Sequence, residues 1–202
     1  MESEHADVSK SAPAPIHGLP RFAVVDIETS GLSTQRDRIL QVAVVTVESG
    51  VVVDEWASLL KLSWPLQRLG PRKVHGINRK MLRSAPPRGE VLTELIERID
   101  GAVFTAHNVR FDWPFIERAA RKAGIAVAPS RRLCTLRLSR QLDPDRQLSH
   151  RLGDVCDRYG VTNARPHDAI YDARATAAIL PHLLQAHGVQ SAADLEPLYD
   201  RR

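Results

Sequence analysis

The stretch VVDIETSGL, residues 24–32, constrains the fold more than any other part of the sequence. Its valines and Ile27 favour a buried strand, yet Asp26 and Glu28 place two carboxyl groups in the same run. Because strand side chains alternate between faces, both acids point to one face and Ile27 points to the other. Two carboxylates on one face repel each other, so they either reach solvent or share a cation.

Two more apolar runs follow this strand, and Ser49-Gly50 is a turn signal that joins them as a hairpin. Helical periodicity and short apolar runs then alternate along the chain, with a helix predicted from Asp112 to a stop at Gly124 and a longer one interrupted or kinked near Pro181. Three leading strands followed by this alternation predict an α/β fold, a mixed β-sheet flanked by α-helices.

The composition fits one globular domain with a nucleic-acid partner. The chain has 202 residues, 43% of them apolar, and a net charge of +4. Cys134 and Cys156 lack metal-ligand spacing and are too few for a disulfide framework, which indicates a reducing, cytoplasmic location. We expect no membrane span and no secretory signal. Residues 1–20 are expected to be a disordered tail, residues 21–188 the folded domain, and residues 189–202 a short C-terminal helix or tail.

Two further polar motifs stand near predicted helix starts. His107 and Asn108 follow a short predicted strand and precede Asp112, for which an N-cap is the simplest interpretation. Open α/β sheets, however, bind ligands at the carboxyl ends of their strands, where this cluster is expected. In the second motif His167 precedes a helix that contains Asp172, whose alternative role is an exposed acid paired with a nearby arginine.

In chain order the motifs are D-x-E, H-N-x-x-F-D and H-x-x-x-x-D, and together they are far more specific than any one of them. They resemble the DEDDh 3′→5′ exonucleases, typified by the epsilon proofreading subunit of bacterial replicative DNA polymerase, within the ribonuclease H-like superfamily. TSGL, VHGI, TLRLSR and LSHRLGDVCDRYGV support the resemblance between the motifs, which extends over residues 21–188.

The resemblance implies a role for each matching residue. The metal-binding acids would be Asp26, Glu28, Asp112 and Asp172, and His167 would be the general base. An all-carboxylate set favours Mg²⁺ or Mn²⁺, and two ions per site would balance the charge. The pocket for the 3′-terminal nucleotide would be lined by Ile27, Thr29, Gly31, Leu32, Val74, His75, His107, Asn108 and Phe111.

Some of these residues have other interpretations. Leu32 could pack in a turn, and His75 could be a structural histidine with both ring nitrogens satisfied. The sequence also departs from the family pattern. Cys134 stands where many relatives have an acid, Asp168 directly follows the predicted base, and we see no counterpart of the tail that docks the epsilon subunit on its polymerase.

We therefore expect a metal-dependent 3′→5′ exonuclease that releases nucleoside 5′-monophosphates from single-stranded or frayed DNA 3′ ends. Two alternatives stay open. One is the same chemistry on RNA ends or short oligoribonucleotides, since nothing in the sequence decides the sugar. The other is a non-catalytic module that binds 3′ ends within a larger complex; the five filled catalytic positions disfavour it. Association with a polymerase also stays open as a partner interaction.

Overall fold

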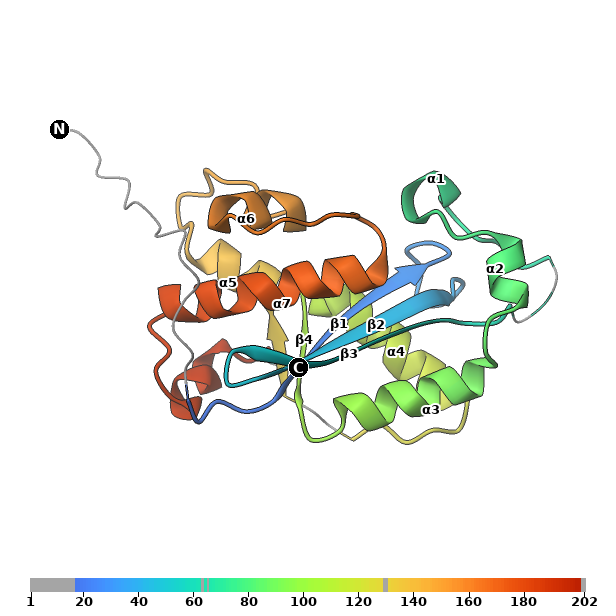
Figure 1. The fold of residues 1–202 in the computed structure, drawn as a ribbon, viewed down its shortest axis with the longest axis horizontal. Coiled ribbons are helices and arrows are strands. Elements are labelled where there is room, and N and C mark those ends of the chain that lie inside the picture. Colours follow the sequence, from blue (N-terminus) through green and yellow to red (C-terminus); the bar gives the residue numbers. More distant parts are fainter. Residues whose placement is uncertain (1–16, 63, 65, 129–130, 201–202) are drawn as a thin grey trace.

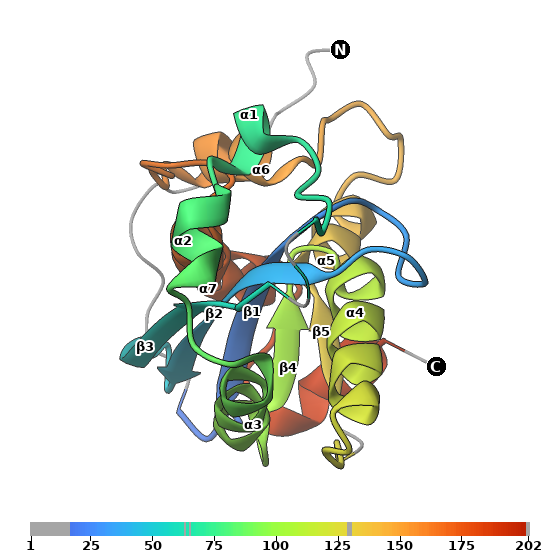
Figure 2. The ribbon, with the colours of Figure 1, turned by 90° about the vertical axis from the view of Figure 1, so that its right-hand side faces the viewer.

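A five-stranded mixed sheet organises the protein in the order β3-β2-β1-β4-β5 (Figures 1 and 2). The computed structural model describes residues 17–62, 64, 66–128 and 131–200. The strands are β1 (Phe22–Thr29), β2 (Ile39–Glu48), β3 (Val51–Leu59), β4 (Val103–Ala106) and β5 (Arg132–Cys134). The first three pair antiparallel, whereas β4 pairs parallel with both β1 and β5.

The predicted hairpin between β2 and β3 is confirmed. Ser49 and Gly50 both have positive φ angles, of 49° and 77°, as the tight turns that suit the right-handed twist of paired strands require. Strand β3 is one edge of the sheet, and Val51, Val52 and Val53 are exposed on it.

Helices cover both faces of the sheet, which divides the core in two. One face packs against α5 (Thr135–Gln141), α6 (Leu152–Tyr159) and α7 (Ala169–Ala186), and the other against α3 (Arg88–Ile99) and α4 (Val109–Lys122). Strand β1 shows the alternation that this requires, because Phe22 and Val24 belong to the α7 side, whereas Ala23, Val25 and Ile27 belong to the α3–α4 side. Two short helices, α1 (Arg72–His75) and α2 (Arg79–Arg83), follow β3.

Two predicted helix limits are wrong. Helix α4 begins at Val109, three residues before Asp112, because the Asn108 carbonyl already accepts the amides of Phe111 and Asp112. Helix α7 runs uninterrupted past Pro181, as the continuous ribbon of Figure 1 shows. Proline removes one helical hydrogen bond, but buried side chains before and after it hold the helix on the sheet. The predicted stop at Gly124 is confirmed, with φ of +71° just after the helix.

Described segments near both chain ends pack against the α7-side core. The predicted disordered tail lies mostly outside the described residues, and within them Leu19 packs against the α7-side core. Near the other end a 3₁₀ helix, η1 (Ala192–Leu198), buries Leu195 and Leu198 in the same core. No helix in the described part of the chain is long and apolar enough to cross a membrane.

Candidate active site

The two acids of β1 lie as strand geometry predicts, on the α7 face. Their antiparallel partners on β2 are Ala43, opposite Asp26, and Gln41, opposite Glu28. Ala43 is small and buried, so it leaves room above the strand for a carboxylate. Ile27 is 5% exposed in the opposite core and fixes the strand from behind.

Asp112 approaches the two acids of β1 from the side of the strand that pairs with β4. The parallel pairing of β1 with β4 ends at Val24 and Thr105, so the next residues of β1 have no partner strand on that side. Asp112, in the first turn of α4, fills this opening, and the main-chain amide of Ile27 stabilises its ionised form. Its side chain is 4% exposed, so the acid is buried at the point where two paired strands separate.

The last acid and the histidine come from the start of α7. Asp172 Oδ2 accepts the main-chain amide of His167 at 2.9 Å, and Asp172 Oδ1 accepts Asn163 Nδ2 at 2.5 Å. His167 has φ of +67°, a left-handed conformation that costs free energy in a non-glycine residue and is concentrated at functional sites. This conformation leaves its imidazole exposed beside the buried carboxylate.

The structure therefore brings groups from three elements together. Glu28, His167 and Asp172 each offer a ligand atom, and these three atoms lie within 4.8 Å of one another. Asp26 and Asp112 complete the cluster electrostatically, since the charge of Asp112 is the strongest charge acting on Asp26.

Burial and mutual repulsion make this cluster costly to ionise. Burial raises the pKa of Glu28 to about 8, and the charges of Asp172 and Asp112 add to the shift. Burial also raises the pKa of Asp112 to about 8, despite the main-chain amides that favour its anion. The pKa values of Asp26 and Asp172 are raised as well, again mainly by burial. Four oxygen-donor acids that repel one another fit hard divalent cations such as Mg²⁺ or Mn²⁺.

The residues expected to line the nucleotide pocket fall into two groups. Leu32 and Val74 are 84% and 46% exposed, and Asn108 is exposed with no capping hydrogen bond from its side chain, so all three can contact a ligand. Thr29 is buried and its hydroxyl donates to the Gly31 carbonyl.

The two histidines of this predicted pocket make structural contacts through both ring nitrogens. His75 Nδ1 accepts the Ile77 amide at 3.0 Å, and Nε2 lies 2.9 Å from the Leu69 carbonyl. These two contacts agree with the alternative interpretation of His75 as a structural histidine. His107 lies 3.0 Å from both the Thr135 hydroxyl and the His150 carbonyl, so it ties β4 to the segments that follow.

Phe111 and Gly31 each lie in close contact with a neighbouring residue. Phe111 lies 5.1 Å from Phe115, centroid to centroid, one helical turn along α4. A Cβ at Gly31 would stand 2.5 Å from the Asp37 carboxylate, so only glycine allows this close approach.

Sequence reasoning missed two positioning residues. Gln41 donates from Nε2 to Asp168 at 3.1 Å and accepts the Ala169 amide at 3.3 Å, which fastens the start of α7 to β2 beside Glu28. A lone glutamine in the apolar run ILQVAVV was the available signal. Asn163 holds Asp172 from a loop, and no pattern in the sequence indicated it.

A family model described as exonuclease (RNase_T) matches residues 23–180. The chain belongs to the exonuclease family. This confirms the resemblance inferred from the motifs and makes the protein a nuclease of the DEDD type. The family depends on divalent metals, in agreement with the acidic cluster.

The curated relatives are much longer proteins. The DNA polymerase III PolC-type proteins of Staphylococcus epidermidis and Staphylococcus aureus are each 36% identical to this chain over 166 residues, 81% of its length. The aligned region is 11% of each relative, so the exonuclease spans about a tenth of the length of the proteins it matches.

Solved structures confirm the ribonuclease H-like fold. Escherichia coli exonuclease I, in complex with a dT13 oligonucleotide, superposes with a TM-score of 0.74 at 19% identity, covering 84% of this chain and 42% of that one. Exonuclease X, in complex with 5′-overhanging duplex DNA, superposes with a TM-score of 0.64 at 24% identity and covers 86% of this chain and 98% of that one.

Proposed function

We propose that this exonuclease removes nucleotides from DNA 3′ ends, single-stranded or frayed, and releases nucleoside 5′-monophosphates. The observation that carries the proposal is the convergence of Glu28, His167 and Asp172 within 4.8 Å beside the buried Asp26 and Asp112. The PolC-type relatives and the oligonucleotide complex of exonuclease I support DNA as the substrate.

The four carboxylates would hold two divalent ions, which would supply charge stabilisation to the phosphodiester and favour ionisation of the attacking water. A ring nitrogen of His167 takes the proton of that water as its oxygen bonds to phosphorus. The P–O3′ bond then breaks, and the 3′ oxygen of the shortened strand takes a proton from solvent. The phosphate stays on the terminal nucleotide, which is released as a nucleoside 5′-monophosphate.

The chain's other residues position these groups. Asn163 and the His167 amide orient the two oxygens of Asp172, while Gln41 fixes the start of α7 next to Glu28. The exposed Leu32 offers an apolar surface to the terminal base, which favours ends whose bases are already unstacked. The two cysteines are free and buried, which supports the cytoplasmic location expected from the sequence.

The test is degradation of single-stranded DNA labelled at its 5′ end, with Mg²⁺ or Mn²⁺. A ladder shortening from the 3′ end together with mononucleotide product is expected, and immediate release of the 5′ label alone would contradict the direction. RNA of equal length and sequence decides the sugar. Asp157→Asn, an exposed acid of α6 outside the site, serves as the charge-matched control for active-site variants.

A further inference from the structure

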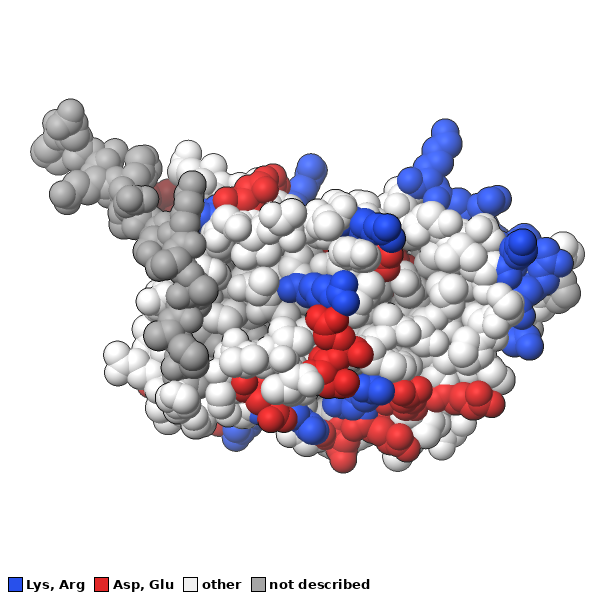
Figure 3. Space-filling model, viewed as in Figure 1, with Lys and Arg blue, Asp and Glu red and all other residues white. Residues whose placement is uncertain are grey.

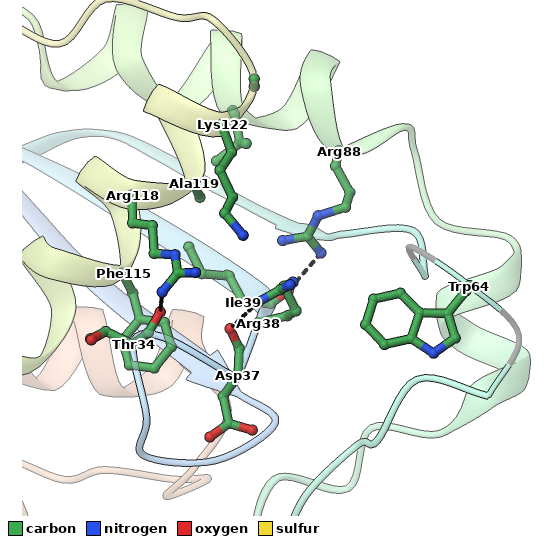
Figure 4. Close-up of a pocket in the computed structure, with 12 residues that line it drawn as sticks. Thr34, Asp37, Arg38, Ile39, Trp64, Arg88, Phe115, Arg118, Ala119 and Lys122 are labelled. Atoms are coloured by element: carbon green, nitrogen blue, oxygen red, sulfur yellow. Dashed lines mark hydrogen bonds between the residues drawn. The ribbon is translucent and has the colours of Figure 1, made fainter.

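A second cluster of like charge lines a cavity away from the acids. This basic cavity, of about 290 Å³, lies between the start of β2, the first turn of α3 and the second half of α4. Its cations are Arg38, Arg88, Arg118 and Lys122, and Figure 4 shows them converging from these three elements.

Three of these cations donate hydrogen bonds to main-chain carbonyls. Arg88 donates to the Ile39 carbonyl at 2.9 Å, Arg118 to the Thr34 carbonyl at 2.6 Å, and Arg38 to the main-chain carbonyl of Asp37 at 3.0 Å. Within the described part of the chain, none of the four forms an ion pair with an aspartate or glutamate.

The one acid that lines the cavity is committed elsewhere. Asp37 accepts the Ser30 hydroxyl at 3.1 Å and the Ser33 amide at 2.9 Å, which closes the loop between β1 and β2. Figure 4 shows its carboxylate pointing away from the guanidinium groups. Among the described residues, the lining of the cavity therefore keeps a net positive charge.

The four cations of the cavity repel one another. Arg38 and then Arg118 lower the pKa of Lys122, and burial followed by Arg38 lowers the pKa of Arg88 to about 10. With its pKa at about 10, Arg88 still carries its charge at neutral pH, and a bound anion would relieve the repulsion. Phosphate oxygens suit three guanidinium groups and an ammonium group.

Helix α4 links this cavity to the active site. Phe111, Phe115, Arg118 and Lys122 follow one another at spacings of four, three and four residues, so they share one face of the helix. Asp112 lies about 9 Å along the axis from Arg118 and about 15 Å from Lys122. A stacked strand rises about 3.4 Å per phosphate, so this distance spans roughly three to four phosphates.

The surface between the two sites is also basic. A neighbouring cavity of about 430 Å³ shares Asp37, Arg38 and Trp64 with the first and extends to Gly31, which is one of the residues predicted to line the nucleotide pocket. The segment 56–89 runs from the end of β3 to the start of α3 and contains no acid. Its eight cations are Lys61, Arg68, Arg72, Lys73, Arg79, Lys80, Arg83 and Arg88. Figure 3 shows Lys and Arg gathering over α1 and α2.

We propose that the basic cavity binds a backbone phosphate of the nucleic-acid substrate, roughly three to four phosphates from the bond that is cut. This proposal rests on the proposed function for its substrate. It assigns the cavity a role in holding longer chains, distinct from the chemistry at the acids. The exposed indole of Trp64, which also lines the cavity, offers a stacking surface for a base of the same strand.

The test compares Arg118→Gln/Lys122→Gln with the control Arg121→Gln, an exposed arginine of the same helix that does not line the cavity. Binding of 5′-labelled dT3 and dT12 is measured by fluorescence anisotropy in EDTA. We expect the double variant to bind dT12 about tenfold more weakly and dT3 within twofold of wild type. Its salt slope for dT12 should fall by about 0.7 for each phosphate that the variant no longer neutralises.

Equal loss on both oligonucleotides, no loss on dT12, or the same loss in Arg121→Gln would overturn the proposal. Thermal melting of each variant excludes unfolding as the cause. Inorganic pyrophosphate is titrated in parallel: if it binds wild type and not the double variant while dT12 binds both equally, the cavity serves a small anion and the proposal is wrong.

A mononucleotide ester separates this proposal from the function itself. The double variant should hydrolyse the p-nitrophenyl ester of thymidine 5′-phosphate at the wild-type rate, because that substrate does not reach the cavity. If wild type cleaves neither the ester nor any oligonucleotide, the proposed function fails, whereas the anisotropy comparison, which needs no cleavage, still decides the cavity.

Discussion

Helix α4 carries part of two like-charged clusters, and the two differ in how they can relieve their repulsion. At its first turn Asp112 joins Asp26, Glu28 and Asp172, whose pKa values are raised, so these acids can take up protons. At its second half Arg118 and Lys122 face Arg38 and Arg88 across the basic cavity. The acids can therefore relieve their repulsion by taking up protons or by binding a divalent cation, whereas a bound anion would relieve the repulsion in the basic cavity. A metal-dependent nuclease meets both kinds of ion: the divalent metal would bind at the acids, and a phosphate of the substrate would bind in the basic cavity.

The largest effect is expected when the acidic cluster loses one charge. Asp112→Asn keeps the shape and burial of the side chain but removes an anionic ligand, so cleavage should fall by about a thousandfold or more. The rate is measured on single-stranded DNA at saturating Mn²⁺, with thermal melting to verify the fold. Wild-type activity in this variant would remove Asp112 from the proposed metal site.

Replacing the histidine between the acids should cost less. His167→Asn removes the imidazole but tolerates a left-handed backbone, so the amide that donates to Asp172 stays in place. We expect the rate to fall by about 10²–10⁴, with metal binding retained. Glycine at the same position, which suits the same φ, should give a similar loss. Full activity in both variants would exclude His167 as the base.

A smaller effect is expected from the residue that orients one acid. Asn163→Ala leaves Asp172 Oδ1 without its 2.5 Å donor, so the metal concentration for half-maximal activity should rise about tenfold. The rate at saturating metal should change by less than about threefold. Thr162→Ala, at the exposed neighbouring position, is the matched control. A change in saturated rate with no change in metal dependence would contradict a positioning role.

The smallest effect concerns stability without metal. An acid whose pKa is raised by folding binds more protons in the folded state, so stability falls as pH rises from about 4.5 to about 8. In EDTA the melting temperature should therefore drop by about 3–6 °C between pH 5.5 and pH 8. Mn²⁺ should restore it at pH 8, and Glu28→Gln should flatten the pH dependence. An equal slope in wild type and Glu28→Gln would show that the acids do not titrate together.

Local patterns explain which parts of the fold were predictable. The strand with two acids, the hairpin at Ser49-Gly50 and the stop of α4 at Gly124 each follow from neighbouring residues, and the structure has all three. The predicted start of α4 is three residues late, because Asp112 is a good N-cap in isolation whereas the Asn108 carbonyl caps the helix in the fold. We predicted that α7 is interrupted or kinked near Pro181, and the interruption is wrong, because a proline's local cost is visible in sequence and the packing that offsets it is not.

The sequence by itself determined the chemistry: the acid types, the histidine, their order and the family that shares them. How Asp112, His167 and Asp172 meet the two acids of β1 followed only from tertiary structure, because hydrogen bonds between distant segments decide it. The end of the β1–β4 pairing admits Asp112, Gln41 fastens α7 to β2, and Asn163 orients Asp172. The basic cavity belongs to the same category, because its cations come from three elements that are separated by tens of residues and meet only in the folded protein.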